Sequence, residues 1–311
     1  MELTQTETQE RSIESSREDA PVPVAPSATP AAGIAPQTCS SCGASPAGGG
    51  GSTAAPPVWI YAVGRIEARF PSISVEKEFA QAIGRTETKA MTDRQTLQAV
   101  LSKPENRYLV RQLCWVMSIE GLETYILVPR DPADYNLLVE ALRPTPQPWD
   151  LDVVIGVKGP IAQPTMCNGL VVPIVGFDQV YSFDRETLIK AIPRPDKTSA
   201  KEFAPAAEEL FDRILQMADN AGATSGDRAL NYLAVRYPAI YANAAEAFGR
   251  NSSLTGVHVH PSPLRGTRNV VDVVFTYTNR SSDVNEKFSV RVDVTDEFPF
   301  LMTKLSPYYD R

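Results

Sequence analysis

The feature that most constrains this chain is an abrupt change in composition near residue 57. Residues 1–57 contain almost no large apolar side chains, are rich in Ala, Pro, Ser, Thr and Gly, and carry more carboxylates than arginines. Such a segment cannot bury enough apolar surface to offset the entropy of ordering it. From Val58 onward, apolar residues recur with the periods of strands and helices. We therefore expect a disordered acidic tail over 1–57, followed by a folded body.

The body divides again at a proline-bearing connector over residues 193–199. Residues 58–192 interleave strand-like and helix-like segments, whereas residues 193–311 show two amphipathic helices and then a β-rich end. Runs of strands joined by short turns favour antiparallel pairing. The sequence therefore predicts an α+β fold made of two mixed subdomains, 58–192 and 193–311, with largely antiparallel sheets.

Several local signals fix individual elements. Glu120-Gly121 separates two β-rich runs, 109–118 and 122–128, and predicts a hairpin. Thr92 and Gln95 have the spacing of a capping box and should open a helix. Residues 227–248 continue as one helical pattern up to Gly249. Strand aromatics such as Trp115 and Tyr125 are expected to line the core or a groove.

Charge and hydropathy exclude several classes of function. The net charge is −7 and the isoelectric point is near 5.1, whereas a nucleic-acid-binding domain normally carries a basic face. No apolar run approaches the ~20 residues that span a bilayer. The first residues show neither the basic region nor the apolar region of a secretory signal. We expect a cytoplasmic protein that contacts neither nucleic acid nor membrane.

The most chemically specific motif is Cys39-x-x-Cys42 followed by Gly43. Two thiolates at this spacing can hold one Zn²⁺, and the glycine permits the tight turn that such a site needs. A structural zinc has four ligands, so this motif supplies only half of the site. A redox role is an alternative, but a thioredoxin-like pair lies between a strand and a helix rather than in a tail.

Three sources could complete the zinc site. The same motif from a second chain would bridge a homodimer through four cysteines. Cys114 or Cys167 could contribute a thiolate, although Cys114 sits in an apolar run that is typical of a packed thiol. His258 and His260 lie two residues apart in a strand-like segment, so their side chains would share one face.

Evidence for catalysis is sparse. Cys167 lies in a turn-like loop and could act as a nucleophile only with a base beside it, for which His258 and His260 are the candidates. The chain has no G-x-S-x-G elbow, phosphate-binding glycine loop or H-E-x-x-H motif. This pattern favours a binding or assembly module over an enzyme.

Charged residues elsewhere give weaker signals. Asp150 and Asp152 flank the start of a strand and are expected at a solvated edge. Arg107, Arg111 and Arg130 could form an anion site, although basic residues beside strands are common.

Long blocks of the body resemble a known family. The blocks are residues 61–67, 70–72, 75–81, 105–109, 121–127, 166–170 and 230–237. Over residues 58–248 the chain resembles the C-terminal domain of uncharacterised function of the PatG-type, subtilisin-like maturation protease and macrocyclase of cyanobactin biosynthesis. The Asp, His and Ser motifs of the protease itself are absent, so the chain resembles that domain without its protease.

The resemblance implies membership of a pathway that matures a ribosomally made, post-translationally modified peptide (RiPP). Its expected partners are the precursor peptide, the protease or macrocyclase, and a heterocyclase. The family domains resemble zinc-binding dimers, in which Cys39 and Cys42 would act as shared ligands. The leading hypothesis is a non-catalytic accessory domain that dimerises and holds a peptide or partner enzyme on a sheet edge or groove. The alternatives are a peptide-modifying enzyme with a Cys167 nucleophile and a purely structural protein.

Overall fold

The computed structural model describes residues 56–86, 90–147, 150–192, 200–216, 220–264 and 266–309. Ala54–Arg311 form one compact unit, distinct from Met1–Thr53. The expected tail over 1–57 and the expected connector over 193–199 therefore lie almost entirely outside the described residues. Among the helices of the described part, none is both long enough and apolar enough to cross a membrane.

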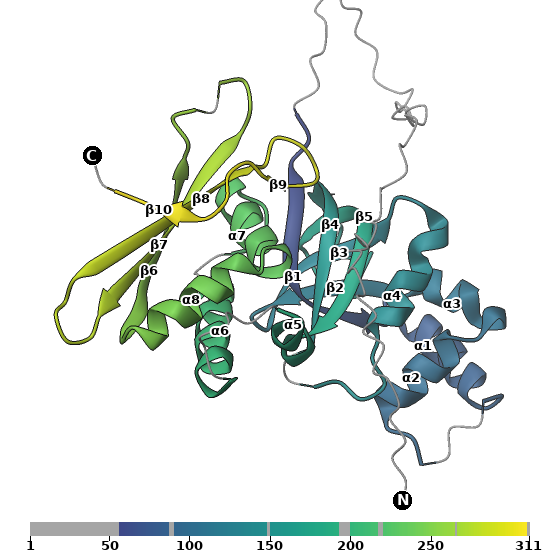
Figure 1. Cartoon of the computed structure of the whole chain (residues 1–311). Helices are drawn as coiled ribbons and strands as arrows, with labels where there is room; N and C mark the ends of the chain where they lie inside the picture. The colour runs from purple at the N-terminus through teal and green to yellow at the C-terminus, as the bar shows by residue number, and fades with distance from the viewer. Residues whose placement is uncertain are drawn as a thin grey trace, which may run out of the picture. The chain divides into compact units, whose positions relative to one another are not determined.

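The first half of the unit is a closed barrel (Figure 1). Its strands follow the order β1-β2-β3-β5-β4, and every pair is antiparallel except the parallel pair of β3 with β5. β1 serves two partners, because its first half pairs with β4 and its second half with β2. Closing the sheet leaves it without a free edge. The strands are β1 (Trp59–Arg69), β2 (Cys114–Ile119), β3 (Leu122–Pro129), β4 (Asp150–Ile161) and β5 (Pro173–Asp184).

Short helices pack beside the barrel and share one apolar core with it. Phe79, Val100, Leu109 and Leu138, each from a different helix, join Trp115 and other strand residues in this core. Burial of such side chains contributes roughly 1.5–3 kcal/mol each. The helices are α1 (Ile73–Ile83), α2 (Asp93–Leu101), η1 (Pro104–Asn106), α3 (Arg107–Gln112), η2 (Pro132–Asp134) and α4 (Tyr135–Ala141).

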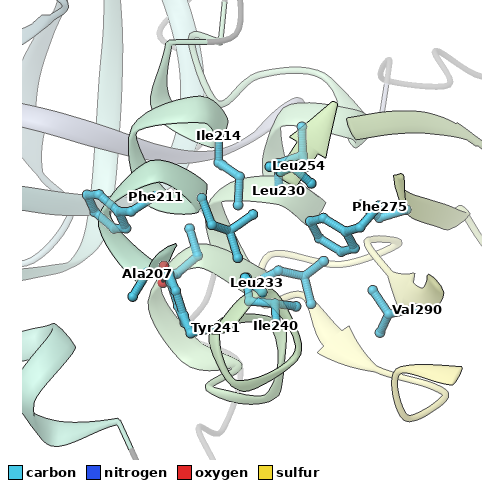
Figure 2. Packing of buried hydrophobic residues seen from close by; sticks show 14 of the residues in the cluster. Ala207, Phe211, Ile214, Leu230, Leu233, Ile240, Tyr241, Leu254, Phe275 and Val290 are labelled. Carbon is cyan, nitrogen blue, oxygen red and sulfur yellow. Dashed lines mark hydrogen bonds between the residues drawn. The ribbon is translucent and has the colours of Figure 1, made fainter. Parts of the chain in front are cut away.

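The second half is a helical layer packed on an open sheet. Its core joins Phe211, Leu233 and Tyr241 of the helices to Phe275 and Val290 of the strands (Figure 2). The helices are α5 (Arg185–Ala191), α6 (Ala200–Leu215), α7 (Ser225–Arg236) and α8 (Ala239–Gly249). The strands are β6 (Ser252–Pro261), β7 (Val270–Asn279), β8 (Asn285–Asp293), β9 (Phe300–Leu301) and β10 (Ser306–Pro307), in the order β10-β8-β7-β6 with β9 beside β8.

Helix α7 joins the two halves, because it packs against β1 on one side and β7 on the other (Figure 1). The Asn231 side chain donates a hydrogen bond to the Tyr61 carbonyl at 2.8 Å. The backbone N–H of Tyr61 donates to the Gly222 carbonyl at 2.9 Å. Gly222 has φ +72°, and a Cβ there would lie only 2.3 Å from the Tyr61 carbonyl oxygen. Only glycine permits this close approach of the two backbones.

The expected α+β class with largely antiparallel sheets is confirmed, as are the capping box at Thr92 and the turn at Glu120-Gly121. Two element predictions were wrong. Residues 107–112 form helix α3 rather than the start of a strand, because the buried side chains of Leu109 and Val110 pack against the barrel core. The expected single helix over 227–248 is two helices, because Pro238 interrupts it.

Candidate functional site

The predicted metal-binding residues fall in different parts of the chain. Cys39 and Cys42 lie outside the described residues. His258 and His260 both lie on β6, and His258 is exposed to solvent. Their side chains share one face of the strand, as expected from their spacing. Within the described ranges, no group of three or more His, Cys, Asp or Glu side chains gathers where a metal ion could sit.

Cys167 lies in the loop between β4 and β5, where it forms a disulfide with Cys114 of β2. The two Cα atoms are 5.7 Å apart, and the bridge joins residues 53 positions apart. This corrects the interpretation of Cys114 as a packed thiol. A sulfur in a disulfide carries no thiolate, so in this state Cys167 is neither a nucleophile nor a metal ligand. The histidines proposed as its base belong to the other sheet.

β6 is the long edge strand of the open sheet, whose other end in the described part of the chain is the two-residue strand β10. At the opposite end of the sheet, β8 is covered by β9 and β10, whereas β6 pairs only with β7 within the described residues. An unpaired strand edge presents a row of backbone N–H and C=O groups that another chain can pair with. This edge is the candidate functional site.

The hydrogen bonds of β6 indicate which backbone groups face outward. Residues of an antiparallel pair alternate between those that bond to the partner strand and those that point away from it. The Ser262 N–H donates to a carbonyl of β7 at 2.9 Å. By this alternation His260 and His258 also bond to β7, whereas Val257 and Val259 direct their N–H and C=O groups to the free edge.

Both ends of the free edge are closed. The register shifts at residue 255, and the carbonyl of Thr255 accepts a hydrogen bond from Arg213 Nη2 of α6 at 2.9 Å. At the other end Pro261 lacks an N–H, which suits a strand edge. Residues 256–260, referred to below as the open edge, form the stretch available for pairing.

A small groove of about 330 Å³ adjoins the open edge. One wall is the first turn of α7, where Ser225 Oγ accepts a hydrogen bond from the Asn269 side chain at 2.6 Å. Val259 and His260 form the opposite wall, and Leu230 adds an apolar surface. A chain paired with the open edge would therefore direct alternate side chains toward this groove.

The outer face of the sheet beside the open edge is polar. His260 lies opposite Asp272, which lies opposite Arg291 on β8. Arg291 Nε donates to one oxygen of Asp272 at 2.6 Å and Nη2 to the other at 3.2 Å. The hydrogen bond that Arg291 donates to Asp272 raises the pKa of Arg291, so this pair is an ionic contact on that face.

A buried charged cluster ties the loop after β8 to the barrel. Arg228 of α7 donates to the carbonyls of Val294, at 2.7 Å, and Glu297, at 3.0 Å, and burial lowers its pKa to about 10. Burial, together with the adjacent Asp178 carboxyl, raises the pKa of Glu297 to about 8. Asp178 also pairs with Arg130 at 2.7 Å. Arg130 therefore pairs with a carboxylate of the protein itself. The sequence had suggested that it helps to form a site for a bound anion.

Sequence reasoning missed several of these residues. Asp152 is buried rather than solvated. It accepts hydrogen bonds from the Ile66 N–H at 2.8 Å and from Ser182 Oγ at 2.5 Å. Asp152 accepts a hydrogen bond from the backbone N–H of β1 at the point where β1 stops pairing with β4 and begins to pair with β2. This role depends on the order of the strands, which the sequence does not show. Arg213 and Glu297 likewise act through contacts with distant segments. By contrast, Trp115 and Tyr125 lie in the core as predicted.

Fold and edge together define a class of protein: an α+β module in which a closed barrel is joined through a helical layer to an open antiparallel sheet. The family model described as PatG Domain matches residues 59–247, and the one described as PatG C-terminal matches residues 197–308. The chain therefore belongs to the PatG domain family, as its sequence blocks indicated.

A solved structure described as "PatG Domain of Unknown Function" shares this fold, with a TM-score of 0.64 and 20% sequence identity. The match covers 80% of this chain and 98% of that one. No curated protein matches the chain.

Proposed function

We propose that this protein is a non-catalytic accessory domain of a cyanobactin-like RiPP maturation system, and that it holds the precursor peptide by strand addition at the open edge. The observation that carries the proposal is the single-sided pairing of β6. Main-chain hydrogen bonds to an exposed edge provide affinity, and pockets for alternate side chains provide specificity.

The geometry of the edge supports this role. Val257 and Val259 each offer one donor and one acceptor, and the adjoining groove of about 330 Å³ could receive a side chain of the added strand. Membership of the PatG family supports the choice of occupant, because the domain it resembles accompanies a protease that matures a precursor peptide. A segment of a partner enzyme could pair with the same edge, so binding of each is measured separately.

A proline substitution tests strand addition. Val257→Pro removes an outward N–H and leaves the bonds to β7 in place. Val257→Ala shortens the same side chain and keeps the N–H. Losing one hydrogen bond of about 0.5–1.5 kcal/mol, and adding a ring against the incoming strand, should weaken binding of a labelled precursor peptide about tenfold or more. We expect Val257→Ala to bind within about threefold of the parent, since it loses no backbone donor.

Fluorescence anisotropy with both variants, after thermal melting confirms that each is folded, decides the question. Equal binding by the proline and alanine variants would rule out the open edge as the docking site. If a partner enzyme binds the open edge and the precursor peptide does not, the precursor peptide is not the ligand of this edge.

We further propose that Cys39 and Cys42 bind a structural Zn²⁺ that supports a homodimer. Cys114 and Cys167 are joined to each other, which leaves two ways to complete the ligand set. The motif of a second chain could supply two more thiolates. Alternatively His258 and His260, which share one face of β6, could supply two nitrogens.

Metal analysis and sedimentation on protein purified without added zinc test this site. Cys39→Ser should lose both zinc and the dimer. The double variant His258→Ala/His260→Ala distinguishes the two ligand sets, because a site of four cysteines would keep its zinc. Absence of zinc from the parent protein would eliminate the metal proposal, and strand addition would remain to be judged on its own test.

A further inference from the structure

Three basic side chains gather in a pocket beside the barrel, away from the elements of the open edge. Lys103, just before η1, and Arg107 and Arg111 of α3 lie four residues apart in sequence, and all three line one cavity of about 330 Å³. Arg107 and Arg111 share a face of α3, since residues four apart in a helix are neighbours. The sequence analysis had named Arg107 and Arg111, but not Lys103, as parts of a possible anion site.

None of the three forms an ion pair within the described residues. Like charges four residues apart on a helix repel each other. The chain as a whole carries a net charge of −7, so a cavity lined by three cations and one carboxylate is unusual for it. An anion entering the cavity would relieve the repulsion among these cations.

The opposite wall comes from η2 and α4. Tyr135 is half-buried; burial raises the pKa of its phenol, and the positive charge of Arg111 opposes that rise. Asn136 adds an amide, and Glu140 is the one carboxylate on the lining. Val110 and Val139 give the cavity an apolar base. A mixed lining of this size suits an organic ligand better than a bare ion.

The spacing of the cations indicates the kind of anion. Arg107 and Arg111 are separated by about 6 Å along the axis of α3, so each guanidinium can take a carboxylate of its own. Side chains two residues apart on an extended peptide are separated by about 6.6 Å. We propose that this cavity binds an extended acidic peptide segment whose carboxylates occupy alternate positions, with Arg107 and Arg111 each taking one.

The test uses the full chain and labelled synthetic peptides. The first alternates glutamate with glycine. The second has glutamine in place of glutamate, and the third has the same composition as the first with its glutamates adjacent. The alternating peptide should bind about tenfold or more tightly than the glutamine peptide, and also more tightly than the peptide with adjacent glutamates. Raising the ionic strength should weaken its binding.

Substitutions locate the site. Arg107→Gln/Arg111→Gln should weaken binding of the alternating peptide about tenfold. Arg85→Gln, at an exposed arginine outside the cavity, should leave it unchanged. Glu140→Gln should tighten it, because a like charge is removed. The comparison of the glutamate and glutamine peptides uses the parent protein alone, so it does not depend on whether any variant folds.

Equal binding of the glutamate and glutamine peptides would overturn the proposal. So would equal losses in the Arg85 variant and the double variant, or complete competition by inorganic phosphate at the same concentration, which would indicate a site for a single small anion. Because the cavity and the open edge use different elements, failure here leaves the Val257 test unaffected.

Discussion

At the scale of single residues, the described part of the molecule depends on polar groups held in unusual surroundings. Glu297 is the clearest case, because its carboxyl lies beside that of Asp178 in a partly buried position and its pKa is raised to about 8. Burial disfavours the charged form of Glu297, and the neighbouring Asp178 carboxyl adds to the effect, so Glu297 keeps its proton to higher pH. The positive charges of Arg130 and Arg228 partly offset this rise in the pKa of Glu297.

Glu297 should make stability depend on pH. Its pKa is 4.5 as a reference and about 8 in the folded protein, so between these values the folded state binds more protons than the unfolded state. The free energy of unfolding therefore falls as pH rises from about 4.5 to 8. Glu297→Gln, which mimics the neutral acid, should remove much of this fall and should be more stable than the parent above pH 8.

Urea unfolding across this pH range checks the prediction, with Glu246→Gln as the control. Glu246 is about half-exposed on α8, where its carboxylate pairs with Arg250 at 4.0 Å. If the parent and Glu297→Gln show parallel stability curves, folding does not raise the pKa of Glu297.

Gly222 should be the glycine least tolerant of substitution among those described. An alanine there would be strained at φ +72° and would also press its Cβ against the Tyr61 carbonyl. We expect Gly222→Ala to destabilise the protein by roughly 3 kcal/mol or more. Gly121→Ala, also at positive φ but with no atom within 4 Å of the new Cβ, should cost only about 1–2 kcal/mol. Equal costs, measured by denaturant unfolding, would show that the backbone contact is unimportant.

At the scale of elements, the sequence predicted correctly those turns and helix starts that depend on neighbouring residues. The turn at Glu120-Gly121 and the helix start at Thr92 depend on neighbouring residues, and both were readable from the sequence. Helix α3 was mistaken for a strand, because β-rich residues there are held helical by packing against a barrel core that no local window contains. Closure of the barrel, the burial of Asp152 and the free edge of β6 all depend on strand order, which is non-local.

The disulfide between Cys114 and Cys167 was also hidden from sequence reasoning, since four cysteines permit several pairings. It fixes the loop before β5 to β2 across 53 positions of sequence. In the chain-entropy treatment, a bridge closing a loop of this length contributes up to roughly 4 kcal/mol. Reduction, or Cys114→Ser, should therefore lower the free energy of unfolding by about 2–4 kcal/mol.

Urea melts with and without a dithiol reductant, paired with titration of free thiols, measure this effect. The control is Cys114→Ser with and without the reductant, because it has no bridge left for the reductant to break. A protein whose four thiols all react in the native oxidised preparation would contradict the pairing.

At the scale of the whole molecule, α7 connects the barrel to the open sheet. Its contacts with Tyr61 and with the loop after β8 hold the first turn of α7 beside β6, where that turn forms one wall of the groove. The barrel has no strand edge to offer, and on the open sheet β6 remains accessible. Among the described strands, β6 thus offers the long edge for pairing, and the cationic cavity lies on separate elements.

Hydrogen–deuterium exchange of the full chain, with and without the precursor peptide, measures this capacity most directly. Strand addition should slow exchange at the amides of Val257 and Val259, which face the free edge, while the amides of β7 keep the exchange rates they have without peptide. If saturating peptide leaves both valine amides exchanging as in the free protein, β6 is not where the peptide binds.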